Sequence, residues 1–188
     1  MDGIKISIRQ SVDSALQPAA GERGARVTLQ AVTLELAQSG DDVFLLEVYA
    51  STCREEMAFA GWSSDQRGLF LGMRYEAQRQ SRVREFPDAE CWVIRRDDVA
   101  AGSMIVSRSR DEILLLDLAL LPEHRNKNVG ALVMASLMEE ASQSPRAVRL
   151  QMESSNPARD WFQRLGFKIV GDSDGNLEML WRPELNQD

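Results

Sequence analysis

The amino-acid sequence predicts a single α/β domain, and three observations carry that prediction. The chain has 188 residues, which suits one domain that is large enough to bury a hydrophobic core. Hydrophobic residues make up 44% of the chain and charged residues 27%, as is ordinary for a soluble globular protein. Segments with the alternation of a strand and segments with helical spacing follow one another without an internal repeat, in the order β-α-α-β-β-β-α-β-α-β-β.

The first 26 residues are expected to form an extension, and the domain proper is expected to span residues 27–188. The segment IKISIR alternates like a short strand. The segment DSALQPAAGERGA follows it, and its small and polar residues, with one proline and two glycines, are typical of a flexible connector. The domain then begins with VTLQAVTLEL, which we expect to be one strand over residues 27–36.

Two helices are predicted after this strand. Residues 41–60 are amphipathic and have two aspartates at their N-terminal end, where negative charge favours a helix. Ser63 and Gln66 form a capping box for a second helix over residues 64–85, and Pro87 stops it. The apolar residues aligned on one face of this second helix are Leu69, Phe70, Met73 and Ala77.

Three strands separated by short polar turns are predicted next, and another helix follows them. The strands are ECWVIRR, AAGSMIVSRS and EILLLDLALL. The third is nearly all apolar, which is typical of a strand that is covered on both faces. The helix is expected from about residue 130 to residue 142. The apolar residues aligned on it are Val133, Leu137 and Ala141.

The last part of the chain is predicted to hold a strand, a helix and a hairpin. VRLQMES alternates as a strand does. Asn156 is a good N-cap and Pro157 a good first helical residue, so a helix is expected to start there and to end at Gly166. FKIVG and NLEMLWR flank DSDG, which is typical of a hairpin turn.

Charge and cysteine content exclude several classes of function. The formal net charge of -7 argues against broad binding to nucleic acid or to anionic membranes, since both need clustered Lys and Arg. Cys53 and Cys91 lie far apart, and His124 is the one histidine, so we expect no metal site and two free thiols. Neither a signal peptide nor a membrane span is apparent, and a cytoplasmic location is expected.

The segment PEHRNKNVG connects the predicted apolar strand EILLLDLALL to the helix that is expected from about residue 130. Amide groups at the start of such a helix can bind a pyrophosphate, and Arg125 and Lys127 add positive charge. The turn needs a residue at positive φ, which Asn128 tolerates, and Gly130 lets a ligand approach the backbone closely. The alternative is a solvated loop whose basic residues bind nothing.

Two blocks of the chain together resemble the GNAT superfamily of N-acyltransferases. The first is LDLALLPEHRNKNVGALVMASLMEEA, and the second is VRLQMESSNPARDWFQRLGF. The phosphate signature of the family is Gln or Arg, two residues, Gly, one residue, and Gly or Ala. Here it begins at Arg125 and ends at Gly130, with Asn128 in place of the first glycine. The resemblance covers most of the chain and implies a mixed, mostly antiparallel central sheet flanked by helices.

The resemblance also implies a site for acetyl-CoA or another acyl-CoA. The backbone of the third strand would hold the pantetheine arm, and the amides from Arg125 to Ala131 would bind the pyrophosphate. Asn156 would contact the cofactor or would serve only as the helix cap. The implied cofactor-binding residues are Leu118, Ala119, Leu120, Arg125, Asn126, Lys127, Asn128, Val129, Gly130, Ala131 and Asn156.

Acyl transfer needs a neutral amine, stabilisation of an oxyanion and a proton for the leaving thiolate. The family usually supplies that proton from a Tyr, and the matching position here is Phe162, which has no proton to donate. In such a family a carboxylate or an ordered water takes the amine proton. Glu56 and Glu153 are the candidate catalytic bases, and Asp117 is a further carboxylate that interrupts an apolar strand. Each of them is alternatively a solvated or ion-paired side chain.

Two hypotheses about function follow. The first is an acyl-CoA-dependent N-acyltransferase that transfers acetyl from acetyl-CoA to the primary amine of a small molecule or a peptide. The second is a non-catalytic GNAT-fold module that binds acyl-CoA or another protein, which the replacements at Asn128 and Phe162 favour. A homodimer stays open in both. A P-loop nucleotide site is a poor alternative, because no Lys-Ser/Thr pair follows the glycine.

Overall fold

The computed structural model describes residues 26–29, 32–53 and 61–184. Within these residues the strands form one mixed sheet of eight strands, in the order β1-β2-β3-β4-β5-β6-β8-β7. Each neighbouring pair is antiparallel except β5 and β6, which are parallel. The strands are β1 Arg26–Leu29, β2 Val32–Leu36, β3 Glu90–Arg96, β4 Val99–Arg108, β5 Glu112–Leu120, β6 Ala147–Glu153, β7 Lys168–Ser173 and β8 Asn176–Trp181. The α/β fold with a mixed, mostly antiparallel sheet is confirmed.

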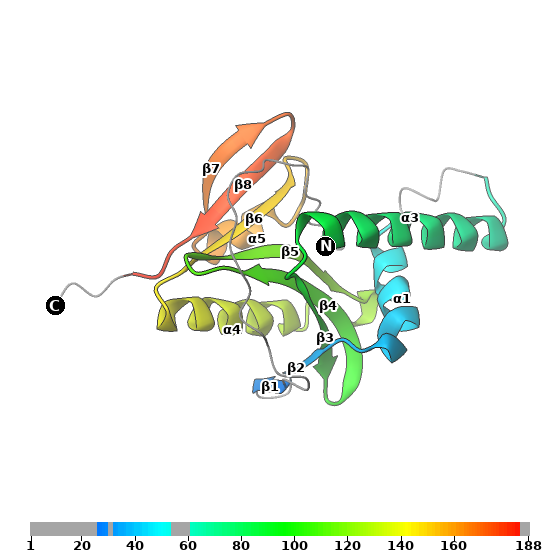
Figure 1. Ribbon diagram of the computed structural model, residues 1–188, viewed down its shortest axis with the longest axis horizontal. Helices are drawn as coiled ribbons and strands as arrows, with labels where there is room; N and C mark the ends of the chain where they lie inside the picture. Colours follow the sequence, from blue (N-terminus) through cyan, green and yellow to red (C-terminus); the bar gives the residue numbers. More distant parts are fainter. Residues whose placement is uncertain (1–25, 30–31, 54–60, 185–188) are drawn as a thin grey trace.

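Helices cover both faces of the sheet (Figure 1). The core between the sheet and α4 and α5 contains Leu118 of β5, Val133 of α4 and Phe162 of α5. On the opposite face, Val48 of α1 packs against Ala119 and Leu121. The helices are α1 Asp42–Thr52, α3 Ser64–Glu85, α4 Val129–Gln143 and α5 Arg159–Arg164, with 3-10 turns η1 Ser39–Asp41 and η2 Pro122–His124.

A bulge in β5 and an early end to its pairing with β6 shape the middle of the sheet. Ile105 of β4 is paired with Asp117, whereas Val106 is paired with Leu115, so Leu116 is an extra residue in β5. The parallel pairing of β5 with β6 ends at Leu115 and Leu150. The remainder of β5 has no partner strand on that side within the described residues, which opens the sheet next to the loop that leads into α4.

Two sequence predictions about the first strand and the first helix are wrong in part. The segment 27–36 is not one strand but two, β1 and β2, which pair antiparallel with Leu29 opposite Val32. The helix predicted over residues 41–60 is α1, which ends at Thr52, and residues 54–60 lie outside the described part. The proposed extension also lies outside it, apart from Arg26, and stays a prediction.

The helices and the hairpin later in the chain match their predictions, except for the start of α5. α3 has the predicted bounds and capping box, with the amide of Gln66 donating to Ser63 Oγ at 3.3 Å. Its aligned apolar face, however, is not packed, because no residue of α3 is buried. α5 begins at Arg159 and not at Asn156, since the residues from Asn156 to Ala158 form a turn before it. The DSDG hairpin is confirmed, with Asp174 and Gly175 at positive φ.

Candidate functional site

The loop between β5 and α4 has the backbone that the sequence required, and it obtains that backbone from two asparagines. Asn126 has φ 56° and Asn128 has φ 63°, both in the left-handed region that asparagine tolerates better than most residues. Asn128 is the residue from which α4 starts. The missing glycine of the signature is therefore replaced by a residue that supplies the same conformation.

Unpaired amide groups gather at the N-terminus of α4. The first helical bond is donated by Leu132 to the carbonyl of Asn128, at 3.1 Å. The amides of Val129, Gly130 and Ala131 precede that bond and are aimed out of the helix end, where the helix dipole is positive. The amide of Arg125, in contrast, donates to the carbonyl of Pro122 at 3.2 Å. The expected series of free amides from Arg125 to Ala131 is thus shorter than predicted.

The side chain of Arg125 is engaged with the protein. Its Nε donates to the carbonyl of Leu120 at 2.9 Å, and its Nη2 lies 3.4 Å from Ser51 Oγ. Ser51 is buried in the last turn of α1. The guanidinium therefore connects the end of α1 to the end of β5, and this contact orients the loop in addition to any charge it offers a ligand.

A pocket of about 420 Å³ lies at this end of α4, and we call it the α4 pocket. This volume is within the range of small-molecule sites. A Cβ placed on Gly130 would lie 3.6 Å from the ring of Trp161 and 3.8 Å from Leu120, so this glycine separates the two side chains. The lining residues are Leu118, Leu120, Arg125, Asn126, Asn128, Val129, Gly130, Ala131, Pro157, Ala158, Asp160, Trp161 and Arg164.

The pocket brings together most of the residues that the sequence proposed, but not all. Ala119 lies on the other face of β5 and lines a different cavity. Lys127 is exposed and does not line the pocket. Asn156 does not line it either, and its Oδ1 accepts a hydrogen bond from the amide of Ala158 at 2.9 Å. Its side chain therefore caps the turn before α5, as one of the two alternatives stated.

Sequence reasoning missed the wall that α5 contributes. Asp160, Trp161 and Arg164 line the pocket, whereas Phe162 is 0% exposed and packs against Phe167 in the core. Within α5 the spacing of three residues puts Trp161 and Arg164 on one face, but the spacing does not tell whether that face lines a pocket or packs in the core. Phe162, at the position where the family usually has its proton donor, faces the core and does not line the α4 pocket.

Of the two candidate bases, only Glu153 lies within the described residues, and it does not line this pocket. Glu56 lies outside the described residues. Glu153 is exposed at the last residue of β6, opposite Asn176 of β8, and its backbone carbonyl accepts from the amide of Asn156 at 2.9 Å. It lines neither of the two cavities described in this section.

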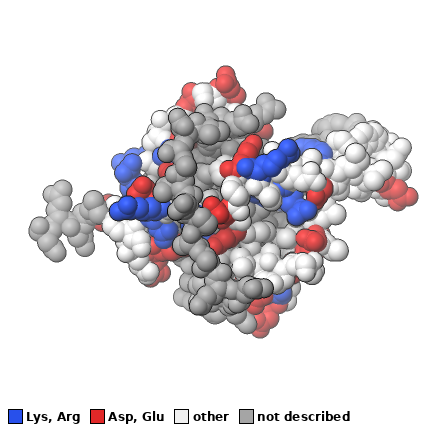
Figure 2. Space-filling view, viewed as in Figure 1, with Lys and Arg blue, Asp and Glu red and all other residues white. Residues whose placement is uncertain are grey.

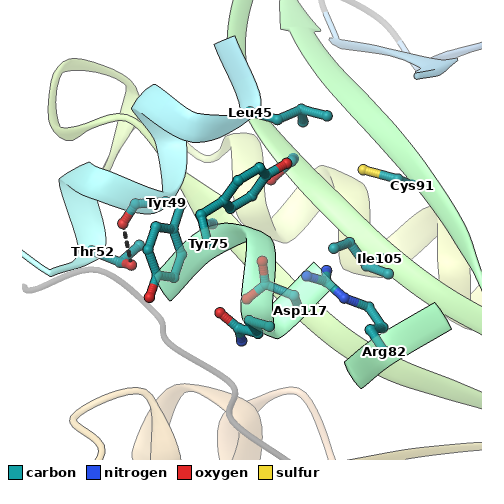
Figure 3. Close-up of a pocket in the computed structure, with 11 residues that line it drawn as sticks. Leu45, Tyr49, Thr52, Tyr75, Arg82, Cys91, Ile105 and Asp117 are labelled. Atoms are coloured by element: carbon teal, nitrogen blue, oxygen red, sulfur yellow. Dashed lines mark hydrogen bonds between the residues drawn. The ribbon is translucent and has the colours of Figure 1, made fainter. Parts of the chain in front are cut away.

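A second cavity, of about 30 Å³, lies on the opposite face of β5, and we call it the α1–α3 pocket (Figure 3). Burial raises the pKa of the Tyr75 phenol above its ordinary value and raises the pKa of the Cys91 thiol to about 11. Both groups are therefore protonated near neutral pH. The lining residues are Leu45, Tyr49, Thr52, Tyr75, Gln78, Arg82, Cys91, Ser103, Ile105, Asp117 and Ala119.

Neither a cluster of metal ligands nor a helix that could span a membrane occurs among the described residues. They contain no group of three or more His, Cys, Asp or Glu that could hold a metal ion. No helix within the same residues is long and apolar enough to cross a bilayer. Positive and negative side chains are mixed over the face seen in Figure 2, without one continuous basic patch among the described residues there.

Comparison with known proteins supports the resemblance to GNAT acetyltransferases. A family model described as "Acetyltransferase (GNAT) domain" matches residues 87–169, from the turn before β3 into β7. The match covers less than half of the chain, and the described architecture is the GNAT fold. The matched segment contains β5, the loop with its two asparagines, α4, β6 and α5, and the α4 pocket lies within it. No curated protein matches the sequence.

Solved structures share the GNAT fold at low sequence identity. The PaiA N-acetyltransferase of Thermoplasma acidophilum, in complex with coenzyme A, is 17% identical with a TM-score of 0.60, over 82% of this chain and 100% of that one. An acetyltransferase of Thermus thermophilus is 14% identical with a TM-score of 0.61, over 84% and 100%. The ribosomal-protein-S18-alanine N-acetyltransferase of Escherichia coli is 16% identical with a TM-score of 0.55, over 80% and 93%.

Proposed function

We propose that the protein is an acyl-CoA-dependent N-acyltransferase that transfers acetyl from acetyl-CoA to a primary amine. The observation that carries this proposal is the α4 pocket, which joins an anion-binding helix end to the open edge of β5. A pyrophosphate needs the helix end, and an extended thioester arm needs the open strand edge. The other described cavity is far too small for such a cosubstrate.

The cosubstrate is proposed to bind in two parts. Its pyrophosphate accepts hydrogen bonds from the amides of Val129, Gly130 and Ala131, and the guanidinium of Arg164 supplies charge from the opposite wall. Its pantetheine arm runs along β5 beside Leu118 and Leu120, where pairing with β6 has ended. Backbone amides at this free edge are available to an oxyanion. The coenzyme A complex of a GNAT-fold neighbour supports this cosubstrate.

The acceptor is proposed to be an amine of a small molecule or a peptide. One GNAT-fold neighbour is named for acetylating an alanine of ribosomal protein S18, and this name supports an amine acceptor of some kind here. Catalytic roles for Glu56 and Glu153 remain predictions. We also propose a cytoplasmic location, which suits the free thiols of Cys53 and Cys91.

One observation favours the second hypothesis, a module that binds acyl-CoA without turnover. Phe162 is fully buried at the position where the family usually has its proton donor. Solvent can still supply a proton to the thiolate through a pocket that is open to water, so this position lowers the expected rate without abolishing it. Binding and turnover are therefore measured separately.

The proposal is tested by calorimetric titration with acetyl-CoA, followed by a thiol-release assay over a panel of amines. Gly130→Asp places a carboxylate in the α4 pocket, and its Cβ meets only ordinary contacts, so the fold is expected to survive. We expect acetyl-CoA affinity to fall tenfold or more, which is about 1.4 kcal/mol. The matched control is Gly68→Asp, because Gly68 in α3 has no neighbour within 4 Å of an added Cβ.

Each result decides between the hypotheses. Unchanged affinity in a folded Gly130→Asp protein would remove the pyrophosphate assignment. Tight binding of acetyl-CoA without thiol release from any amine would favour the non-catalytic module. Loss of affinity in both glycine variants would mean that added negative charge, and not the pocket, is responsible.

A further inference from the structure

The end of β5 remains attached to β4 after its pairing with β6 has ended. Leu120, the last residue of β5, lies opposite Gly102, and the next amide, that of Leu121, donates to the carbonyl of Ala101 at 2.9 Å. Because the two ends of a trans peptide group point in opposite directions, the carbonyl of Leu120 faces the side where β6 is no longer paired. The N–H and C=O of one strand residue point to the same side, so the Leu120 amide faces that open side too.

Gly102 fixes the peptide group that precedes Leu120. A Cβ on Gly102 would clash with the carbonyl oxygen of Ala119, and it would lie 2.7 Å from Leu120 Cδ2 and 2.9 Å from Leu120 Cα. No side chain fits there without moving β5, so the glycine allows the two backbones to approach closely. This close approach limits the rotation of the peptide group between Ala119 and Leu120, which is the group that carries the Leu120 amide.

The side chain of Arg125 fixes the peptide group that follows Leu120. Its Nε donates to the Leu120 carbonyl at 2.9 Å, which is the length of a good hydrogen bond. Its Nη2 lies 3.5 Å from the carbonyl oxygen of Ser51 and 3.4 Å from its Oγ, at the long limit for a hydrogen bond. Ser51 is buried in α1. The planar guanidinium thus spans from the open edge of β5 to α1, and its shorter contact is the one to Leu120.

The orientation of the Leu120 amide matters for acyl transfer. Attack on a thioester places negative charge on its carbonyl oxygen, and a fixed N–H group stabilises that charge without having to reorient. Leu120 lines the α4 pocket, where the thioester arm is proposed to lie. Gly102 holds the peptide group before this residue, and Arg125 holds the one after it. The amide is therefore oriented before a ligand arrives.

We propose that Arg125 is a positioning residue for acyl transfer, which holds the Leu120 amide toward the oxygen of a bound thioester and does not act as a ligand of the phosphates. This inference rests on the proposed acyltransferase function. The amine nitrogen forms a bond to the thioester carbon, and the carbonyl electron pair moves onto the oxygen, which accepts a hydrogen bond from Leu120. The pair returns as the carbon–sulfur bond breaks, and sulfur leaves with the bonding electrons. The nitrogen releases a proton to solvent, and solvent protonates the thiolate.

Two substitutions of Arg125 separate its charge from its shape. Arg125→Lys keeps the charge and loses the planar fork that reaches Leu120 and Ser51, whereas Arg125→Gln loses both. With both substrates saturating, kcat is expected to fall about tenfold or more in each variant, since a misplaced group slows the reaction. The Kd of acetyl-CoA should change by less than about threefold, because the amide acts on charge that develops in the transition state. Arg67→Gln, on the exposed start of α3, is the matched control and should equal the parent.

Infrared spectroscopy measures the hydrogen bond to the thioester without turnover. Acetyl-CoA is isotopically labelled at the acetyl carbonyl, whose stretching frequency falls when its oxygen accepts a hydrogen bond. We expect a lower frequency for the ligand bound to the parent than for the free ligand, and a return toward the free value in both Arg125 variants. Arg67→Gln should keep the frequency of the parent. A variant that only lost stability would still give the frequency of the parent once it is folded and saturated.

The outcomes separate this inference from the proposed function. Unchanged kcat and unchanged carbonyl frequency in the Arg125 variants overturn the inference and leave the acyltransferase in place. Full activity in Arg125→Lys, with weaker acetyl-CoA binding in Arg125→Gln, overturns it in favour of a phosphate ligand. If the parent binds acetyl-CoA but acetylates no amine, turnover fails as a function and the infrared shift alone decides the inference. A parent that does not bind acetyl-CoA overturns the proposed function and the inference with it.

Discussion

Helices α4 and α3 have similar apolar spacing in the sequence and opposite roles in the structure. α4 has 15 residues and buries five of them. α3 has 22 residues and buries none, and Leu69 and Met73 on its apolar face are 70% and 66% exposed. Figure 1 shows α4 lying against the sheet and the N-terminal half of α3 extending past α1. Apolar spacing thus predicts that a segment is helical without predicting that the sheet will cover it.

The difference also separates the two pockets. The α4 pocket is built on a helix that the core fixes in place. The α1–α3 pocket has a wall from α3, through Tyr75 and Arg82, and this helix relies on its capping box and on contacts with α1. Most of the stability of a helix in a protein comes from packing of its apolar face, and α3 buries none of its residues. The α4 pocket is therefore expected to be rigid, and the α1–α3 pocket easier to deform.

The largest predicted effect comes from the same substitution made on both helices. Leu137→Ala on α4 removes a side chain that is 2% exposed and should reduce the free energy of unfolding by about 2–5 kcal/mol. Leu69→Ala on α3 should change it by less than about 0.5 kcal/mol. Urea denaturation of both variants measures this. A loss above about 2 kcal/mol for Leu69→Ala would show that α3 is covered in solution, for example by a second copy of the chain.

The strands show which sequence signals are sufficient. The predicted segments ECWVIRR and EILLLDLALL agree within a residue with β3 and β5, because burial on one or both faces leaves a clear pattern. The hairpin at Asp174 and Gly175 is predictable because those residues favour positive φ. The break between β1 and β2 is not, since Gln30 and Ala31 between them carry no turn signal. Patterns in the sequence reveal buried faces and turns that use characteristic residues. The connection between β1 and β2 has no such residues, so no pattern predicts it.

An intermediate effect is expected from Phe162→Tyr, which tests whether the core side of α5 differs from the exposed face of α3. The new hydroxyl would lie in the core among Trp161 and Phe167 without a partner, which should cost about 1–3 kcal/mol of stability. Phe70→Tyr on α3 is the matched control, since Phe70 is 36% exposed and a hydroxyl there reaches water. Denaturation and thiol release are both measured. A faster acyl transfer in Phe162→Tyr would show that the hydroxyl reaches the leaving sulfur after all.

The loop of the α4 pocket could be predicted from the sequence, whereas the wall that α5 contributes to this pocket could not. Asn126, Asn128 and Gly130 are residue types that a tight turn at a helix start requires, so the sequence is enough to predict the loop. Trp161 gives no such indication, because an apolar side chain on a short helix has no local signal for which side it faces. Asp117 stands out as costly in its strand, but its cavity is formed by α1 and α3, whose relative placement no local pattern encodes.

The smallest predicted effect concerns the ion pairs of the two helices. Glu140 of α4 accepts hydrogen bonds from Arg108 of β4 at 2.8 and 2.9 Å and from Arg146 at 3.0 Å. Glu76 of α3 accepts from Arg79 of the same helix at 2.7 and 2.9 Å, and both side chains are exposed. The first network ties a helix to the sheet, and the second stays within one helix. The first should therefore contribute more to the stability of the fold.

The pH dependence of Glu140→Gln tests this difference. Burial opposes ionisation of Glu140, but the hydrogen bonds and charges of Arg108 and Arg146 outweigh it and lower its pKa below the ordinary value of 4.5. Its contribution is thus complete above pH 4.5 and is lost as the pH falls through the lowered pKa. At neutral pH, Glu140→Gln should lower the free energy of unfolding by about 1 kcal/mol. Between the ordinary and the lowered pKa of Glu140, the stability of the variant should fall less steeply with decreasing pH than that of the parent, because the variant lacks the titrating carboxylate. Glu76→Gln should change the unfolding midpoint less and in a salt-dependent way, because water screens that pair. Equal effects of the two substitutions would mean that α3 is held to the fold as firmly as α4, and the contrast between the two helices would be lost.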